Sequence, residues 1–396
     1  MAFRTLDQAD LKDQRALVRV DFNVPIQDGA ISDDTRLRAA LPTIDALRKA
    51  GAKVILLAHF DRPKGKVVPA MSLRPVTEPL ARLIGAPVAF AEDCLGPEAA
   101  KAIAALKAGD VLLLENLRFH SGEEKNDPDF AKALAAEGDL FVNDAFSAAH
   151  RAHASTEGLA RLLPAYAGEA MRRELEALDR ALGKPERPVL GIVGGSKVST
   201  KLDLLGHLVT KLDRLAIGGG MANTFLFAQG VDVGASFCEK DLADTARTII
   251  AEAGKHHCEL LLPIDVVVAE RMEPGVPSNV RSLTDIGEAE RILDAGPESV
   301  KRLIAAMDQS KTLVWNGPLG VFEIPPFDAG TVAAAKHAAD LVRVGKLVAV
   351  AGGGDTVAAL NAAAVVEDFT FVSTAGGAFL EWMEGKTLPG VAALML

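Results

Sequence analysis

The sequence predicts an α/β protein made of two doubly wound, Rossmann-like domains with parallel sheets, joined by a helix and hinge. Short apolar, β-branched runs alternate with amphipathic helical patterns along the chain, which is typical of βαβ units. The length of 396 residues, 49% of them hydrophobic, is enough for about two cores. Near the middle, a charged helical pattern follows Gly168 and ends before Pro185. This segment is the predicted connection between the domains.

Composition excludes several classes of partner and compartment. The formal net charge of −10 argues against nucleic acid and anionic membranes as partners. No stretch has the length of a transmembrane helix, and the N-terminus lacks the apolar run of a signal peptide. Three cysteines, widely spaced and odd in number, favour a reducing compartment over a disulfide framework. We therefore expect a cytoplasmic protein whose anionic ligands bind to local basic patches.

The first half contains four predicted strands, and polar or basic residues follow each of them. The strands are expected at residues 15–20, 53–58, 111–114 and 140–143, and helices at 37–50, 76–84, 97–106 and 130–137. In parallel sheets of this kind, ligands bind outside the carboxyl ends of the strands. The residues expected there are Asp21, Asn23, Arg36, His59, Arg62, Arg118 and Arg151. Four arginines at one sheet edge predict a site for a small, multiply charged anion, although each taken singly could be a surface arginine.

The second half repeats the alternation, with strands expected at residues 188–193, 214–217, 265–268, 312–315, 347–350 and 370–372. The first of these strands runs into Gly194 and Gly195, and a helical pattern begins beyond them. Such a turn exposes backbone N–H groups and the positive end of a helix. Lys197 and Lys201 are four residues apart, so we expect them to share a helix face and to point toward one ligand. The turn suits a polyphosphate; the alternative is an ordinary βα turn with solvated lysines.

Three further glycine-rich loops follow strands of the second half, at residues 218–223, 315–323 and 352–356. In the last of them Asp355 opens a helix, so its carboxylate could hold a magnesium ion on a bound phosphate. The alternative is that Asp355 only caps the helix. His150 and His153 are spaced as metal ligands can be, but no cysteine or third histidine lies nearby in the sequence, and we assign them no metal.

Together these motifs resemble the phosphoglycerate kinase family nearly from end to end. The resemblance is carried by residues 19–25 (RVDFNVP), 143–146 (NDAF), 148–155 (AAHRAHAS), 194–198 (GGSKV) with Lys201, 218–223 (GGGMAN), 314–323 (VWNGPLGVFE) and 352–356 (GGGDT). It implies a monomeric, cytoplasmic kinase of glycolysis that uses magnesium. The implied reaction is reversible phosphoryl transfer between 1,3-bisphosphoglycerate and ADP, giving 3-phosphoglycerate and ATP, in line after domain closure.

The resemblance also implies domains and site residues. A domain at residues 1–168, with 388–396 packing back on it, would bind phosphoglycerate, and a domain at 185–387, reached through the connecting helix 169–184, would bind the nucleotide. Arg36 and Lys197 are implied as catalytic residues. The phosphoglycerate-binding positions are Asp21, Asn23, Arg36, His59, Arg62, Arg118 and Arg151. The nucleotide-binding positions are Lys201, Gly219, Asn316, Glu323, Gly353, Gly354, Asp355 and Thr356, with Asp355 also as the metal ligand. Because the acceptor is a carboxylate, already ionised at neutral pH, no general base is required.

Two residues depart from the usual pattern of that family. Phe60 and Asp61 stand where the family usually has Leu-Gly, in the loop with His59 and Arg62, and Ser147 replaces a common glycine. A carboxylate beside Arg62 could weaken the anion site or pair with a neighbouring base. We expect neither change to touch a residue with a chemical role.

Two other functions fit parts of the pattern. An NAD-dependent dehydrogenase would use glycine turns on doubly wound sheets, but none of the clusters fits G-x-G-x-x-G. A non-enzymatic binding protein for a small anion would explain the arginines but not Lys197, Lys201 and Asp355. A rise in melting temperature with magnesium-ADP but not with NAD would favour the kinase over the dehydrogenase.

Overall fold

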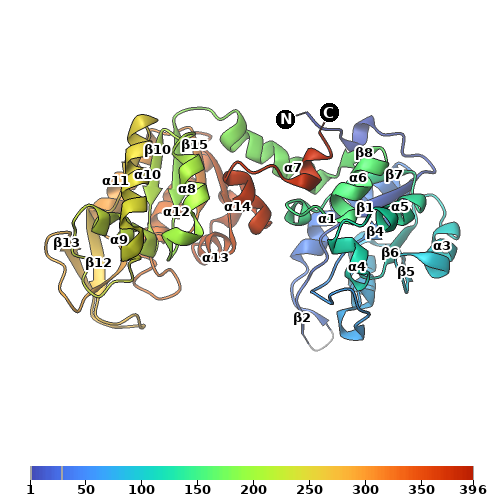
Figure 1. The fold of residues 1–396 in the computed structure, drawn as a ribbon, viewed down its shortest axis with the longest axis horizontal. Coiled ribbons are helices and arrows are strands. Elements are labelled where there is room, and N and C mark those ends of the chain that lie inside the picture. Colours follow the sequence, from blue (N-terminus) through green and yellow to red (C-terminus); the bar gives the residue numbers. More distant parts are fainter. Residues whose placement is uncertain (1, 28–29, 396) are drawn as a thin grey trace. The chain divides into compact units, whose positions relative to one another are not determined.

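The structure is a computed structural model that describes residues 2–27 and 30–395 (Figure 1). The chain divides into two compact units, the first formed by Met1–Glu176 with Thr387–Leu396 and the second by Ala177–Lys386. Each unit contains a parallel sheet of six strands, which confirms the predicted fold class. Within the described ranges, no helix is both long enough and apolar enough to cross a lipid bilayer.

The sheet of the first unit has the strand order β5-β6-β4-β1-β7-β8. Its strands are β1 (Arg15–Arg19), β4 (Lys53–Leu57), β5 (Val88–Ala91), β6 (Val111–Leu114), β7 (Leu140–Asn143) and β8 (Ala165–Ala167). The four predicted strands occur within one residue of their expected ends, because their apolar runs are buried almost throughout. Sequence analysis missed β5 and β8, which are short and only partly buried. A small hairpin of β2 (Ile26–Gln27) and β3 (Ala30–Ile31) lies apart from this sheet.

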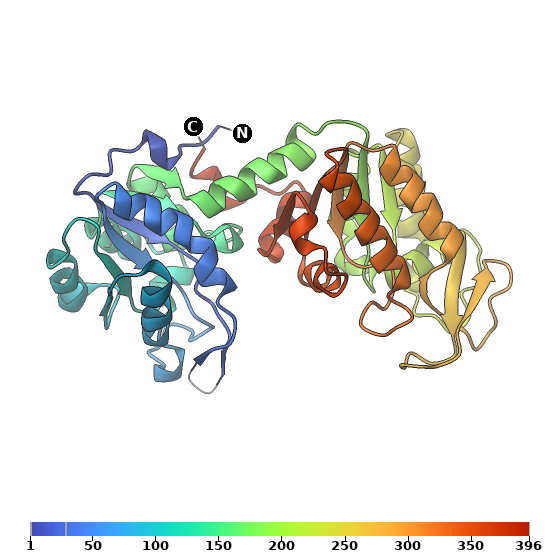
Figure 2. The same cartoon turned by 180° about the vertical axis from the view of Figure 1, so that it is seen from behind.

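Helices cover both faces of this sheet (Figures 1 and 2). They are α1 (Thr35–Lys49), α2 (Thr77–Ile84), α3 (Gly96–Ala104), α4 (Ser121–Glu124), α5 (Pro128–Ala136) and α6 (Leu159–Leu162), joined by the short C-terminal α15 (Pro389–Ala392). On one face, Ile44 and Leu47 of α1 pack into a core with Val18 and Leu56. The helix α5 begins two residues before its predicted start, because the Asp127 side chain accepts hydrogen bonds from the first backbone N–H groups.

The strand β1 lies where the strand order of this sheet reverses. Its neighbour β4 follows it in sequence and lies on one side, whereas β7 lies on the other. The loops that leave β1 and β7 therefore diverge, and such a switch point is where ligands bind in open α/β sheets. These loops begin at Val20 and Asp144.

The predicted charged helix is α7 (Glu169–Leu178), followed by one π-helical turn at Asp179–Gly183. Residues of the first unit hold its start. The buried Asp144 carboxylate accepts hydrogen bonds from the N–H groups of Ala170 and Met171 at 2.9 and 3.2 Å. At Gly168 a Cβ would lie 2.3 Å from Asp144 Oδ1, so only glycine lets the chain pass this close to the capping carboxylate.

The sheet of the second unit has the order β11-β10-β9-β15-β16-β17. Its strands are β9 (Val189–Val193), β10 (Arg214–Ile217), β11 (Glu259–Leu261), β15 (Thr312–Asn316), β16 (Val348–Gly352) and β17 (Phe371–Ser373). Its helices are α8 (Leu202–Leu208), α9 (Gly219–Ala228), α10 (Ala243–Lys255), α11 (Pro297–Asp308), α12 (Ala329–Arg343), α13 (Gly354–Ala362) and α14 (Gly377–Met383). The helices lie on both faces of the sheet (Figures 1 and 2). The switch point here lies between β9 and β15.

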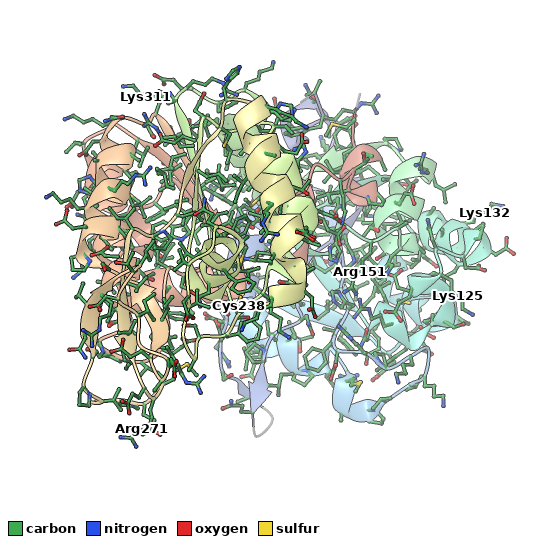
Figure 3. The ribbon with its side chains drawn as sticks, turned by 60° about the vertical axis from the view of Figure 1, so that its left-hand side comes forward. Lys125, Lys132, Arg151, Cys238, Arg271 and Lys311 are labelled. Atoms are coloured by element: carbon green, nitrogen blue, oxygen red, sulfur yellow. The ribbon has the colours of Figure 1, made fainter. Side chains whose placement is uncertain are left out.

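One predicted strand of this half does not join the parallel sheet, so that expectation is wrong. The strand β12 (Asp265–Ala269) lies between β13 (Asn279–Ser282) and β14 (Arg291–Ala295) in a three-stranded antiparallel sheet. In β12, Val266 and Val268 are buried whereas Asp265 and Val267 are not, the alternation of a sheet with one solvated face. Arg271 in the loop after β12 is labelled at the outer end of this small sheet in Figure 3.

Candidate functional site

The end of β1 and the loops after β4, β6 and β7 gather cationic and imidazole side chains at the carboxyl edge of the first sheet. We call this group the basic cluster; its members are Arg19, His59, Arg62, Arg118, Arg151 and His153. Burial lowers the pKa of the Arg118 guanidinium, and Glu124, whose Oε1 lies 3.3 Å from Arg118 Nε, opposes this. The positive charges of Arg151 and Arg62 lower this pKa further. Arg151 is labelled in Figure 3. Neighbouring positive charges lower one another's pKa, and a bound anion would relieve their repulsion. This arrangement therefore favours binding of an anion.

The inner part of the basic cluster is hydrogen-bonded and almost closed to solvent. Arg19 is fully buried, and its NH2 group lies 2.8 Å from Nδ1 of His59, which is 8% exposed. Burial lowers the pKa of His59 well below its ordinary value, and Arg19 is the next largest cause. Burial, with Arg19 and Arg118, lowers the pKa of His153 to about 3. Both imidazoles are therefore neutral at physiological pH.

Asp21, Asn23 and Arg36 form the rim of the same site. Arg36 NH1 donates hydrogen bonds to Asp21 Oδ1 at 3.0 Å and to the Asn23 carbonyl at 2.9 Å. The Arg36 side chain is 39% exposed, so it keeps donors free for a ligand. Of the other predicted residues on this side, Arg62 is exposed and Arg118 is 5% exposed.

The two departures from the family pattern do contact site residues, so the expectation that they touch none is wrong. The Asp61 N–H donates to Asn23 Oδ1 at 2.9 Å, and the Asp61 carbonyl accepts from Arg118 NH1 at 2.8 Å. Asp61 has φ of +52°, a left-handed conformation that aspartate tolerates and that explains why glycine is usual there. The Ser147 hydroxyl donates to Asp21 Oδ2 at 2.6 Å. Both residues therefore help to position the rim.

In the second unit, the turns after β9 and β15 lie against each other. Gly194 N–H donates to the Asn316 carbonyl at 2.9 Å. Lys201 Nζ folds back to donate to the Gly194 carbonyl and to Asn316 Oδ1, each at 2.6 Å. Burial lowers the pKa of Lys201 to about 8, and the nearby Asp355 partly opposes this. The ammonium group therefore lies inside the paired turns.

Lys197 and Lys201 do not share a helix face, contrary to our expectation. Lys197 is in extended conformation, a 3-10 turn follows at Val198–Thr200, and α8 begins only at Leu202. The glycine turn delays the helix by several residues, so the i, i+4 rule does not apply. Lys197 is exposed. It remains available to a ligand, whereas Lys201 is engaged by the protein.

A cavity of about 910 Å³ adjoins these turns. Glycines of three loops and acidic and apolar side chains line it, among them Gly195, Gly219, Gly320, Leu293, Glu323 and Asp355. Gly219 has φ of +65°, and a Cβ there would lie 2.6 Å from the Gly195 carbonyl oxygen. This close approach keeps the floor of the cavity as bare backbone, which suits phosphate groups.

The predicted nucleotide residues differ in what their side chains do. Asn316 and Thr356 are buried and bonded to the protein, Asn316 Nδ2 donating to the Gly352 carbonyl and Thr356 Oγ1 accepting from the Gly317 N–H, each at 2.7 Å. Asp355 is exposed in the first turn of α13. The N-cap of this helix is Gly353, so Asp355 does not serve as the cap.

Sequence reasoning missed three members of the first site. Arg19 and His153 belong to the basic cluster, and the fully buried Glu123 lies beneath it. Arg19 ends a strand whose residues 16–18 are apolar, directly before the buried Val20, and this charge inside an apolar run is a signal that could have found it. Elsewhere in the described residues, Asp93, Cys94 and His120 are close enough to be considered as metal ligands. His120 and Asp93 already pair at 2.6 Å and burial keeps the Cys94 thiol protonated, so we assign no metal there.

Comparison with known proteins gives one answer throughout. The chain matches the model of the phosphoglycerate kinase family over residues 6–386. It is 74% identical over 394 residues to the phosphoglycerate kinase of Caulobacter vibrioides (strain NA1000 / CB15N), and the match covers 100% of both chains. It is 61% identical over 393 residues to the phosphoglycerate kinase of Methylorubrum populi, and that match covers 99% of this chain and 98% of the other. Among solved structures, phosphoglycerate kinase from Coxiella burnetii matches with a TM-score of 0.93 at 41% identity, covering 99% of this chain and 98% of that one.

Proposed function

The chain belongs to the phosphoglycerate kinase family, and on that premise we propose which of its side chains hold each substrate. It catalyses reversible phosphoryl transfer between 1,3-bisphosphoglycerate and ADP, giving 3-phosphoglycerate and ATP, a step of glycolysis and gluconeogenesis. The phosphoryl acceptor is a carboxyl group, so the protein needs to align two anions and neutralise their charge rather than remove a proton.

We propose that the first unit binds phosphoglycerate. The observation that carries this proposal is the concentration of guanidinium groups around Arg118 at the switch point of the first sheet. Bidentate guanidinium groups suit the phosphate and the carboxylate of this substrate. The residues proposed to bind it are Asp21, Asn23, Arg36, His59, Arg62, Arg118 and Arg151.

We propose that the second unit binds the nucleotide at the 910 Å³ cavity. The residues assigned to it are Lys201, Gly219, Asn316, Glu323, Gly353, Gly354, Asp355 and Thr356, of which Asn316 and Thr356 shape the turns. The exposed Asp355 carboxylate fits magnesium, which prefers one or two carboxylates together with substrate phosphates. When bound, magnesium neutralises charge on the nucleotide phosphates.

We further propose that Arg36 and Lys197 stabilise the phosphoryl group during transfer. Each has an exposed or half-exposed cationic head. Donors aimed at charge that develops in the transition state are the main contribution an enzyme makes to phosphoryl transfer. Direct transfer requires the two reacting oxygens to lie in line with the phosphorus, so we propose that the domains close before the reaction.

We propose functional domains at residues 1–168 and 185–387, connected by 169–184, with 388–396 packing back on the first. The Gly390 N–H donates to the Ala149 carbonyl at 2.8 Å, which supports the last assignment.

We also propose a cytoplasmic monomer, in keeping with three free cysteines. Light scattering coupled to gel filtration measures the oligomeric state, and a dimer mass would contradict this proposal.

A coupled assay with 3-phosphoglycerate, ATP and magnesium tests the proposed sites when it is applied to variants. The wild type should form 1,3-bisphosphoglycerate only when magnesium is present. A folded protein without turnover above background would contradict the function and favour a binding protein for small anions.

We expect Asp355→Ala to weaken magnesium-nucleotide binding about tenfold or more and to leave phosphoglycerate affinity nearly unchanged, because one carboxylate ligand of the metal is lost. Calorimetric titration of each ligand separately measures the two affinities. The control is Asp244→Ala, since Asp244 also lies in the first turn of a helix of this unit but does not line the cavity. Equal weakening of both ligands by Asp355→Ala would mean that this loop is structural.

A further inference from the structure

Glu123 of α4 is a fully buried carboxylate directly beneath the basic cluster. Both of its oxygens bond to one residue: the Ser155 hydroxyl donates to Oε1 at 2.6 Å and the Ser155 N–H donates to Oε2 at 3.0 Å. Because the Ser155 hydroxyl donates its one hydrogen to Glu123, Ser155 Oγ can only accept a further hydrogen bond. Arg19 Nε donates this bond at 2.8 Å. Glu123, Ser155 and Arg19 thus form a directed chain of hydrogen bonds.

The buried charges of this chain depend on one another. Arg19 is fully buried, and a buried guanidinium without an opposite charge nearby strongly destabilises a fold. Burial raises the pKa of Glu123, and the charge of Arg19 is the largest cause that opposes this rise. The Arg19 NH1 group is also held, since it donates to the Val20 carbonyl at 2.5 Å. The orientation of the guanidinium is therefore determined from beneath the site.

The remaining group, Arg19 NH2, lies 2.8 Å from His59 Nδ1. A guanidinium can only donate, so Nδ1 must accept with its lone pair and cannot carry a proton. A neutral imidazole with an unprotonated Nδ1 has its proton on Nε2. Nε2–H is then the one ring donor that His59 can offer to a bound anion.

We propose that Glu123 is a positioning residue of the phosphoglycerate site: through Ser155 and Arg19 it holds His59 as a neutral imidazole with its proton on Nε2. A neutral donor bonds an anion without adding another positive charge to the neighbouring arginines. The substrate part of this inference rests on the proposed function, whereas the protonation state of His59 does not.

The protonation state is tested by NMR on protein labelled with ¹⁵N-histidine, with the His59 signals assigned from a His59→Gln variant. We expect one tautomer with Nε2–H, unchanged between pH 8 and pH 5. The groups that face His59 are Arg19 from β1, Arg118 from the loop after β6, and Arg151 and His153 from the loop after β7, and all of them oppose its protonation. A proton on Nδ1, or a cationic His59 at pH 6, overturns the proposal.

The positioning role is tested with Glu123→Gln and Ser155→Ala, which break the chain at two different links. In both variants we expect His59 to show a mixture of tautomers or to titrate, and the KM for 3-phosphoglycerate to rise about tenfold with a smaller change in kcat. The control is Glu157→Gln, a partly buried carboxylate two residues after Ser155 that bonds to Arg161 and Asn126, and it should change neither readout.

The outcomes separate the two parts of the inference. If neither variant changes the His59 spectrum or the KM, the positioning role is overturned. If the spectrum changes and the KM does not, the link to phosphoglycerate is overturned and the error lies in the proposed function. Should Glu123→Gln fail to fold, the wild-type spectrum still tests the tautomer of His59, and Ser155→Ala, which removes the hydroxyl that links Glu123 to Arg19, still tests the positioning role.

Discussion

Arg36→Met should mainly lower kcat, by about a hundredfold or more, a loss of roughly 3 kcal/mol, with a smaller rise in the KM for 3-phosphoglycerate. Arg36 is held by Asp21 and by the Asn23 carbonyl, so its guanidinium is oriented before any ligand binds. An interaction made only in the transition state appears in kcat, and we assign Arg36 to the transferring phosphoryl group. Steady-state kinetics measures both parameters.

Arg118→Met is the matched comparison, because Arg118 is proposed to hold the distal phosphate of phosphoglycerate throughout the cycle. It should raise the KM by about tenfold, or 1.4 kcal/mol, with a smaller loss in kcat through poorer positioning. Arg118 is 5% exposed, pairs with Glu124 at 3.3 Å and donates to the Asp61 carbonyl. Because burial disfavours its charge and so offsets part of these contacts, the variant should remain folded, as circular dichroism and thermal melts would show.

The two kinetic profiles can contradict these roles in distinct ways. A kcat defect in Arg118→Met with only a KM defect in Arg36→Met would mean that the roles are reversed. No change in either parameter for Arg36→Met would mean that Arg36 is a surface arginine, and that the transferring group is stabilised elsewhere.

Gly194→Ala should destabilise the second unit by about 3 kcal/mol and abolish stabilisation by magnesium-ADP. A Cβ at this position would lie 1.8 Å from the Pro318 carbonyl oxygen and 2.7 Å from its carbon. Both atoms are backbone, so no side-chain rotation relieves the collision and the turns after β9 and β15 must separate. The same turns hold Lys201 at the Gly194 carbonyl. Urea unfolding with and without magnesium-ADP measures both effects.

Gly206→Ala is the control for this prediction. Gly206 lies within α8, and no atom beyond its chain neighbours and the backbone of its own helix would lie within 4 Å of a Cβ there. Alanine in a helix interior is favoured over glycine by about 0.5–1 kcal/mol, so this variant should be as stable as the wild type or more stable, and should respond to magnesium-ADP. A Gly194→Ala protein with the stability of the wild type and undiminished nucleotide binding would show that the contact between the turns is dispensable.

The central strands of both sheets could be predicted from the sequence because a strand buried on both faces is a continuous apolar run, a local signal. The runs 111–114 and 140–143 predicted β6 and β7 with their observed ends. The same reasoning missed β5, and it located β12 without showing that this strand belongs to a separate antiparallel sheet. Both strands are partly exposed, so they are not continuous apolar runs. Which of their residues are apolar depends on the neighbouring elements that cover them, and a local pattern does not show those neighbours.

The residues that follow each buried strand were also predictable, because parallel strands end at one edge. This is why Arg36, Arg118 and Asp355 could be proposed without a structure. Sequence spacing could not say how those side chains are used. Lys201 has the same residue type as Lys197 and lies four positions away, yet its ammonium group lies inside two paired turns while that of Lys197 is exposed.

By itself the sequence determined the fold class, the strands that carry the sites and the family, because these depend on patterns within single segments. Only the tertiary structure decided that Asp61 adopts a left-handed conformation between Asn23 and Arg118, that Ser147 holds Asp21, and that Glu123 lies beneath Arg19. The last pair is separated by more than a hundred residues. Hydrogen-bond partners and burial depend on contacts between segments that are distant in the chain. A local sequence pattern therefore cannot predict which donor meets which acceptor, or which nitrogen of His59 carries the proton.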